Sequence, residues 1–76
     1  MMFSKTTFCY FEGKLSWPEL VGARGEDAVA TIEKERIFTT AYIVPEGSAV
    51  IQNYSCYRVW VWVNASGIVI LVPKVG

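Results

Sequence analysis

Two strongly β-prone runs in this sequence are separated by a stretch that fits neither a tight turn nor a helix. The runs are Thr40–Val44 and Arg58–Asn64, and the intervening stretch begins at Pro45. It is too long for a tight hairpin and lacks a helical apolar period, and such connections are usually functional or disordered. Because Ala49–Ile51 and Tyr54 are apolar or aromatic, disorder is disfavoured. We therefore interpret the stretch as an extended segment that the rest of the chain displays.

The composition indicates one small domain with a packed core. The chain has 76 residues, of which 53% are apolar, including three Trp, four Tyr and four Phe. Seven basic and seven acidic residues give no net charge, so neither nucleic acid nor a membrane surface is an expected partner. No apolar run approaches the roughly 20 residues of a bilayer span. We expect a flexible tail over residues 1–7, without the pattern of a signal peptide, and a single domain over residues 8–76.

The absence of histidine limits the chemistry that this chain can perform. The general base of most catalytic triads is missing, and the carboxylates have no nucleophile as a partner, so we expect no enzyme. Cys9 and Cys56 do not form a C-x-x-C pair, and without histidine the usual zinc ligands are lacking, so we expect no metal or other cofactor. The two cysteines could be paired or could be two free thiols, because pairing depends on geometry.

One helix is predicted from about Glu26 to Glu35. Ala28 and Ile32, with Val29 beside them, recur at helical spacing and predict a single buried face. The start of the helix is weakly capped, because Arg24 or Gly25 stands where Ser, Thr or Asp is preferred. The end carries no glycine or proline stop. Ahead of the helix, Trp17 precedes a proline, which favours an extended backbone, and we expect its indole to anchor this segment to the core.

The run Arg58–Asn64 alternates as a half-buried strand does. Its valines should face the helix, with Arg58, Trp60 and Trp62 on the other side. A turn at Asn64–Gly67 should lead into a last strand, Ile68–Val72, that runs back along it and is terminated by Pro73. The predicted fold class is α+β, with one helix packed on a small mixed β-sheet and a long exposed loop.

Four motifs occur in a fixed order between about Lys14 and Gly76. They are Ser16-Trp-Pro-Glu-Leu-Val-Gly22, Glu46-Gly-Ser48, Tyr57-Arg-Val-Trp-Val-Trp-Val63 and Val72-Pro-Lys-Val-Gly76. In sequence and spacing they resemble the potato inhibitor I family of serine protease inhibitors. The resemblance implies a protein that presents its long loop to a serine endopeptidase in the manner of a substrate, as a monomer.

The resemblance also implies the reactive residues. It places the scissile bond between Gln52 and Asn53. The rest of the protease-binding loop would be formed by Gly47, Ser48, Ala49, Val50, Ile51, Tyr54 and Ser55. In the family, basic side chains of the following strand support the loop; Arg58 matches one of these positions, whereas Trp60 replaces the second. A tryptophan there would contact the loop by packing beneath it.

The family resemblance also bears on the cysteines and on the target. Cys9 and Cys56 match the positions that form a disulfide in two-cysteine members, and such a bond favours an extracellular or vacuolar location. Gln52 is neither the cation that a trypsin-like pocket binds nor the apolar ring that a chymotrypsin-like pocket binds. We therefore expect preference for subtilisin-like proteases and weaker inhibition of the other two. The alternative is an inhibitor-fold domain that binds another protein, with weak or lost inhibitory activity.

Overall fold

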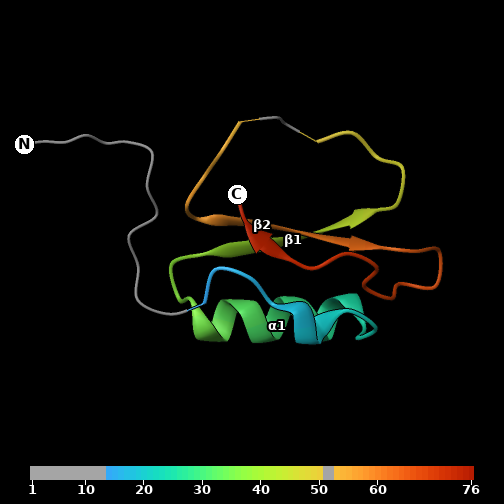
Figure 1. Cartoon of the computed structure of the whole chain (residues 1–76), viewed down its shortest axis with the longest axis horizontal. Coiled ribbons are helices and arrows are strands. Elements are labelled where there is room, and N and C mark those ends of the chain that lie inside the picture. Colours follow the sequence, from blue (N-terminus) through green and yellow to red (C-terminus); the bar gives the residue numbers. More distant parts are fainter. Residues whose placement is uncertain (1–13, 51–52) are drawn as a thin grey trace, which may run out of the picture.

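The computed structural model describes residues 14–50 and 53–76. The expected tail over residues 1–7, the rest of the chain up to residue 13, and Ile51 and Gln52 lie outside the described residues. One helix, α1 (Gly25–Glu35), packs on a sheet of β1 (Thr40–Pro45), β2 (Arg58–Val63) and β3 (Lys74–Val75), and the short 3-10 helix η1 (Pro18–Leu20) precedes it (Figure 1). The predicted α+β architecture is confirmed.

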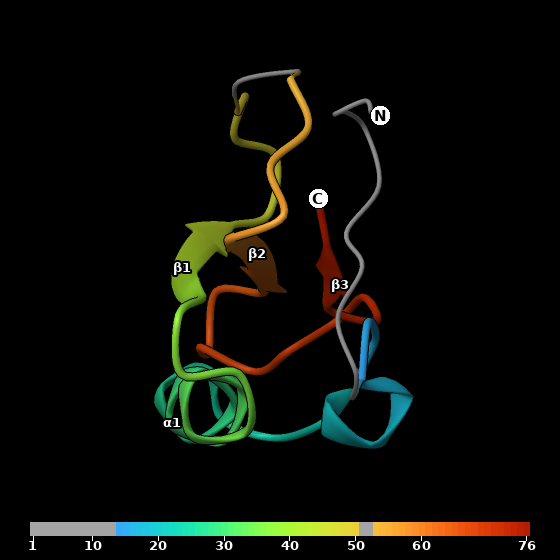
Figure 2. The same ribbon diagram turned by 90° about the vertical axis from the view of Figure 1, so that its left-hand side faces the viewer.

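The sheet is mixed, and its topology explains why the connection after β1 is long. β1 and β2 are parallel, with Tyr42 opposite Trp60, and β3 is antiparallel to β2, with Val75 opposite Val59. A strand of this length spans about 20 Å. Because the next strand points the same way, the chain must return over that distance between Pro45 and Arg58. The described parts of this connection, residues 46–50 and 53–57, lie on the side of the sheet opposite α1 (Figure 2).

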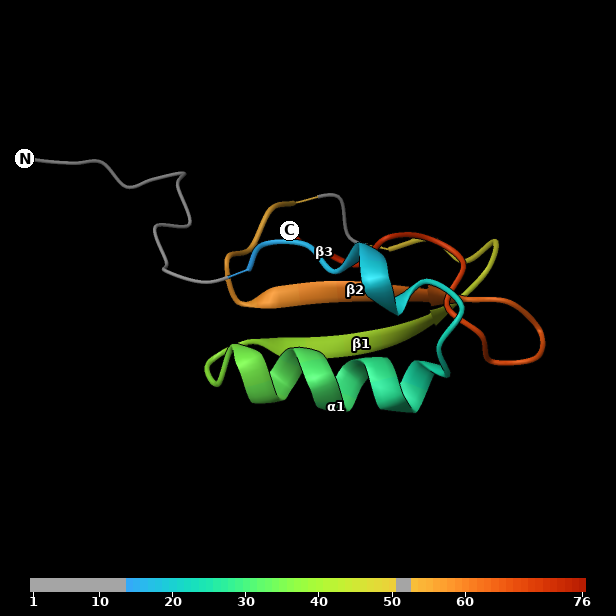
Figure 3. The same ribbon diagram turned by 60° about the horizontal axis from the view of Figure 1, so that its bottom comes forward.

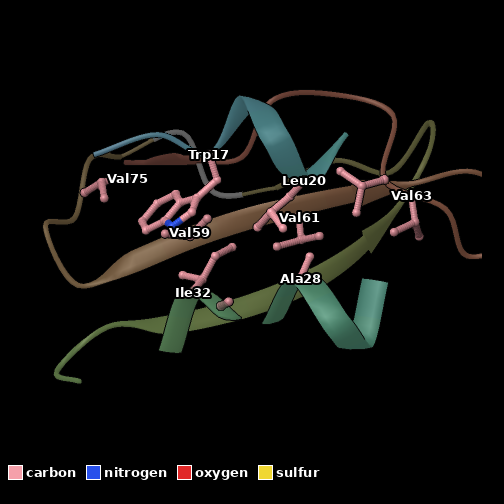
Figure 4. Packing of buried hydrophobic residues seen from close by; sticks show 10 residues of the cluster. Trp17, Leu20, Ala28, Ile32, Val59, Val61, Val63 and Val75 are labelled. Carbon is pink, nitrogen blue, oxygen red and sulfur yellow. The ribbon is translucent and has the colours of Figure 1, made fainter. Parts of the chain in front are cut away.

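The core lies between β2 and α1, as the alternation predicted. Val59, Val61 and Val63 are buried and belong to one cluster with Ala28 and Ile32 of the helix (Figure 4). The axis of α1 runs alongside β1 and β2, so one face of α1 packs on this side of the sheet, with η1 beside it (Figure 3). Burying a valine or isoleucine side chain stabilises a fold by about 1.5–3 kcal/mol.

Trp17 anchors the amino-terminal segment, as expected. Its side chain is fully buried in the core cluster. The indole Nε1–H donates to Oε1 of Glu35 at 2.9 Å, and the Trp17 backbone N–H donates to the carbonyl of Pro73 at 2.9 Å. Trp17 therefore joins the end of α1 to the last segment of the chain.

The weak helix start is compensated by backbone contacts. Arg24 occupies the N-cap and its side chain makes no capping hydrogen bond, as predicted. Instead, the N–H of Gly25 donates to the carbonyl of Gly67 at 2.8 Å. A Cβ at Gly25 would lie 3.0 Å from Cγ1 of Val63, so glycine permits this close approach.

Within the described ranges, no helix is long and apolar enough to cross a membrane.

The prediction of a last strand at Ile68–Val72 ended by Pro73 was wrong in its extent. Val63 pairs with Val69, and Trp60 pairs with Lys74. The first and second pairs are three positions apart along β2 but five positions apart along the last segment. The last segment therefore carries two extra residues between these pairs. Leu71 and Val72 are exposed there, whereas Pro73 is buried. Since proline has no N–H to donate, the ladder is interrupted before it and resumes at β3. Pro73 therefore precedes the last strand rather than terminating one.

Candidate functional site

The loop begins with a turn that redirects the chain at the end of β1. The N–H of Ser48 donates to the carbonyl of Pro45 at 3.1 Å, and Gly47 has φ +88°, a conformation that glycine adopts without strain. The N–H of Glu46 donates to Val63 at 2.8 Å, which ties the turn to the end of β2. Beyond the turn, Ala49 is exposed and Val50 half-buried, and neither lies in a helix or strand.

Arg58 holds the other arm of the loop. Its Nη1 donates to Oδ1 of Asn53 at 3.0 Å, and its Nη2 donates to the Asn53 backbone carbonyl. Its Nε donates to the backbone oxygen of Gly76 at 2.8 Å. Donation from a charged guanidinium gives shorter and stronger hydrogen bonds than donation from a neutral group. One side chain of β2 therefore joins the loop to the carboxyl-terminal residue.

Trp60 lies beside this arginine on the loop side of β2. The Arg58 guanidinium carbon lies 4.7 Å from the centroid of a Trp60 ring, a cation–π distance. The ring of Tyr42, on β1, is 5.4 Å from Trp60 and tilted by 47°. Trp60 therefore contacts Arg58, the side chain that holds Asn53. From the sequence we expected Trp60 to pack directly beneath the loop.

The loop arm after Asn53 has further contacts close to β2. Tyr54 is exposed, yet a Cβ at Gly76 would lie 3.2 Å from its Cε1, so its ring adjoins the end of the chain. The hydroxyl of Ser55 accepts from the N–H of Tyr57 at 3.3 Å. Cys9 lies outside the described residues, so the Cys9–Cys56 pairing stays a prediction.

Sequence reasoning missed one residue that contacts the loop, Arg36. It appeared only as part of an unmarked helix exit, whereas its Nη2 donates to the carbonyl of Cys56 at 3.2 Å. A weak signal was available, because an arginine followed three residues later by a threonine can form a local side-chain hydrogen bond. The bond predicted to be reactive is only half described: Asn53 is exposed, whereas Gln52 lies outside the described residues, as does Ile51.

Comparisons with known proteins agree with this geometry. The model of the Potato inhibitor I family matches residues 10–76. A "Proteinase inhibitor" of Linum usitatissimum is 48% identical over 63 residues, covering 83% of this chain and 91% of the relative. A "Trypsin/subtilisin inhibitor" of Amaranthus caudatus is 41% identical over 63 residues, covering 83% and 91%. The crystal structure of bitter gourd trypsin inhibitor, 45% identical, superposes with a TM-score of 0.83 over 86% of this chain and 96% of that one.

The fold and the site together define a small α+β protein that displays an irregular loop, held from the strand below, on the side of the sheet opposite its helix. The bitter gourd trypsin inhibitor just described has the same fold. The chain belongs to the Potato inhibitor I family of protease inhibitors.

Proposed function

We propose that this protein inhibits serine endopeptidases by presenting residues 47–55 as a substrate, with Gln52–Asn53 as the reactive bond. The observation that carries the proposal is the pair of hydrogen bonds from Arg58 to Asn53, next to that bond. A loop held in one extended shape loses little conformational entropy on binding a protease. The names of relatives, which include trypsin and subtilisin inhibitors, support the target class.

Holding Asn53 also favours resynthesis of a cut bond. When the protease serine attacks the carbonyl of Gln52, the peptide bond breaks, and Asn53 leaves as an amine with a proton from the protease. If that amine stays beside the acyl carbon, it can attack the ester, re-form the bond, and return the proton as the serine oxygen leaves. The hydrogen bonds of Arg58 keep the oxygens of Asn53 in place during this interval. Inhibition is then slow, reversible proteolysis.

The preferred target follows from the side chain before the reactive bond. Gln52 would leave the buried carboxylate of a trypsin-like pocket poorly paired, and burying its amide in an apolar pocket costs about 1–3 kcal/mol. A subtilisin-like cleft gains affinity along the extended backbone, where Ala49, Val50 and Ile51 offer apolar contacts. We therefore expect tightest binding to subtilisin-like enzymes and weaker binding to trypsin-like and chymotrypsin-like enzymes.

A second candidate is an inhibitor fold that binds another protein with little inhibitory activity. Trp60 favours this reading, because it occupies a position where the family places a second basic support. The two candidates predict different fates for the loop. Incubation with subtilisin, trypsin and chymotrypsin, followed by activity assays and mass spectrometry, should give at least one tight complex with slow cleavage after Gln52. Rapid cutting within the loop by every protease, without inhibition, would support the second candidate.

A further inference from the structure

Arg36 is a buried cation at the end of α1. The residue is only 7% exposed. Removing a guanidinium from water is costly unless hydrogen bonds replace those to the solvent. Three of its nitrogens donate to protein oxygens: Nε to Oγ1 of Thr39 at 3.1 Å, Nη1 to the carbonyl of Lys14 at 3.4 Å and Nη2 to the carbonyl of Cys56 at 3.2 Å. These acceptors belong to three segments that are distant from one another in the sequence.

The orientation of this guanidinium is set by a tight turn. The N–H of Thr39 donates to the Arg36 carbonyl at 2.9 Å, and the buried Thr39 hydroxyl accepts from the side chain of Arg36. Both ends of the turn therefore point inward, and the residues between them, Ile37 and Phe38, protrude with 76% and 77% exposure. The turn holds the arginine in one direction, toward the end of the loop.

We propose that Arg36 is a positioning residue for the inhibitory loop, acting through Cys56. This inference rests on the proposed function. If the reactive bond is Gln52–Asn53, both residues held by arginines lie on the amine side of the cut: Arg58 holds Asn53 and Arg36 holds Cys56. The segment 53–57, which carries the new amine, is then tied near both of its ends. Arg36 makes religation more probable without contacting the protease.

The test compares four variants in the intact, oxidised protein. Arg36→Met removes the donors while keeping an unbranched apolar stem. Arg36→Lys keeps the charge, and Thr39→Val removes the oxygen that orients the guanidinium at nearly constant shape. Arg24→Met is the matched control, because Arg24 is an exposed arginine at the other end of α1 whose described ion pair is with Glu26. For each variant we would measure the inhibition constant and the free energy of unfolding. We would also measure the ratio of cut to intact loop at equilibrium, reached with a catalytic amount of subtilisin.

Arg36→Met is expected to raise the inhibition constant and the cut-to-intact ratio by about tenfold each, which corresponds to about 1.4 kcal/mol. Arg36→Lys should recover part of both losses, and Arg24→Met should keep the wild-type inhibition constant and cut-to-intact ratio. The cut-to-intact ratio separates the roles, because both of its species are folded and a purely structural arginine would leave it unchanged. If Arg36→Met loses free energy of unfolding but keeps the wild-type inhibition constant and cut-to-intact ratio, the proposal is overturned.

Two further outcomes are also decisive. If Arg36→Met does not fold, Thr39→Val provides the test: a twofold to threefold rise in the cut-to-intact ratio supports the proposal, and no change contradicts it. If the wild type inhibits no protease, the proposed function fails separately. The rate of loop cleavage by subtilisin then reports on positioning: faster cutting in Arg36→Met supports the role of Arg36, and equal rates overturn it.

Discussion

Arg58 donates to both oxygens of Asn53, to Oδ1 at 3.0 Å and to the backbone carbonyl, across the base of the exposed loop. A planar guanidinium can make such a forked contact, whereas a lysine ammonium acts as a point charge. The same guanidinium lies against Trp60, which limits its movement. A side chain of β2 therefore contributes to the position of Asn53.

Replacing Arg58 should weaken inhibition while the fold survives. Arg58→Ala removes the contacts with Asn53 and Gly76, so the inhibition constant should rise and cleavage at Gln52–Asn53 should accelerate. The Asn53 contacts are exposed, and we expect about a tenfold effect rather than the larger losses of buried charges. Arg58→Lys should be intermediate, because the fork is lost. If both quantities keep their wild-type values in Arg58→Ala, Arg58 does not support the loop.

The two cysteines are predicted to pair with each other. Thiol titration of the denatured, non-reduced protein should find almost no free sulfhydryl, and a peptide map should contain a Cys9–Cys56 linkage. Closing most of the chain removes about 4 kcal/mol of unfolded-state freedom on the chain-entropy model. Reduction should speed loop cleavage before α1 or the sheet unfolds, since Cys56 lies at the loop end. Detection of two reactive thiols would refute the pairing.

Protease preference should follow residue 52. Gln52→Arg places a cation opposite the carboxylate of a trypsin-like pocket and should improve trypsin inhibition by about 10- to 100-fold. Gln52→Leu should improve chymotrypsin inhibition by removing a buried amide. Inhibition constants of the three proteins against subtilisin, trypsin and chymotrypsin provide the test, with circular dichroism as the control for folding. An unchanged order of preference in both variants would mean that another bond is reactive.

Trp17 should be among the most sensitive core positions. Trp17→Ala leaves a large cavity and removes the indole hydrogen bond to Glu35, so unfolding should require about 3–5 kcal/mol less free energy. Trp17→Phe keeps most of the ring volume and should lose less. Trp62→Phe is a suitable control, because Trp62 is half-buried on the loop side of β2. Urea denaturation measures all three; equal costs for Trp17→Phe and Trp62→Phe would contradict an anchoring role.

Two exposed carboxylates should titrate below their ordinary range. A hydrogen bond from Arg24 lowers the pKa of Glu26 below 4.5, and one from Lys14 does the same for the pKa of Glu19. Both ion pairs therefore stabilise the fold above about pH 4.5. This stabilisation is lost as the pH falls through the lowered pKa values of Glu26 and Glu19. Arg24→Gln should raise the pKa of Glu26 and leave that of Glu19 unchanged, as followed by NMR. A Glu26 titration insensitive to Arg24→Gln would exclude the pair in solution.

The elements with a regular local pattern were predictable from the sequence alone. The 3.6-residue spacing of Ala28 and Ile32 located α1, and the alternation of valines in β2 identified its buried face, because burial on one side imposes these periods on any helix or strand. The motif order identified the family. It also pointed to Arg58 as the support of the loop, a position at which the structure has contacts with Asn53.

Only the tertiary structure decided which distant groups meet. Arg36 reaches Cys56 across 20 positions and Arg58 reaches Gly76 across 18, and the two extra residues between Val69 and Lys74 appear only once β3 is paired with β2. No local period encodes such contacts. They depend on how α1 and the last segment pack around β2, and buried polar groups then hydrogen-bond whichever partners that packing brings within reach.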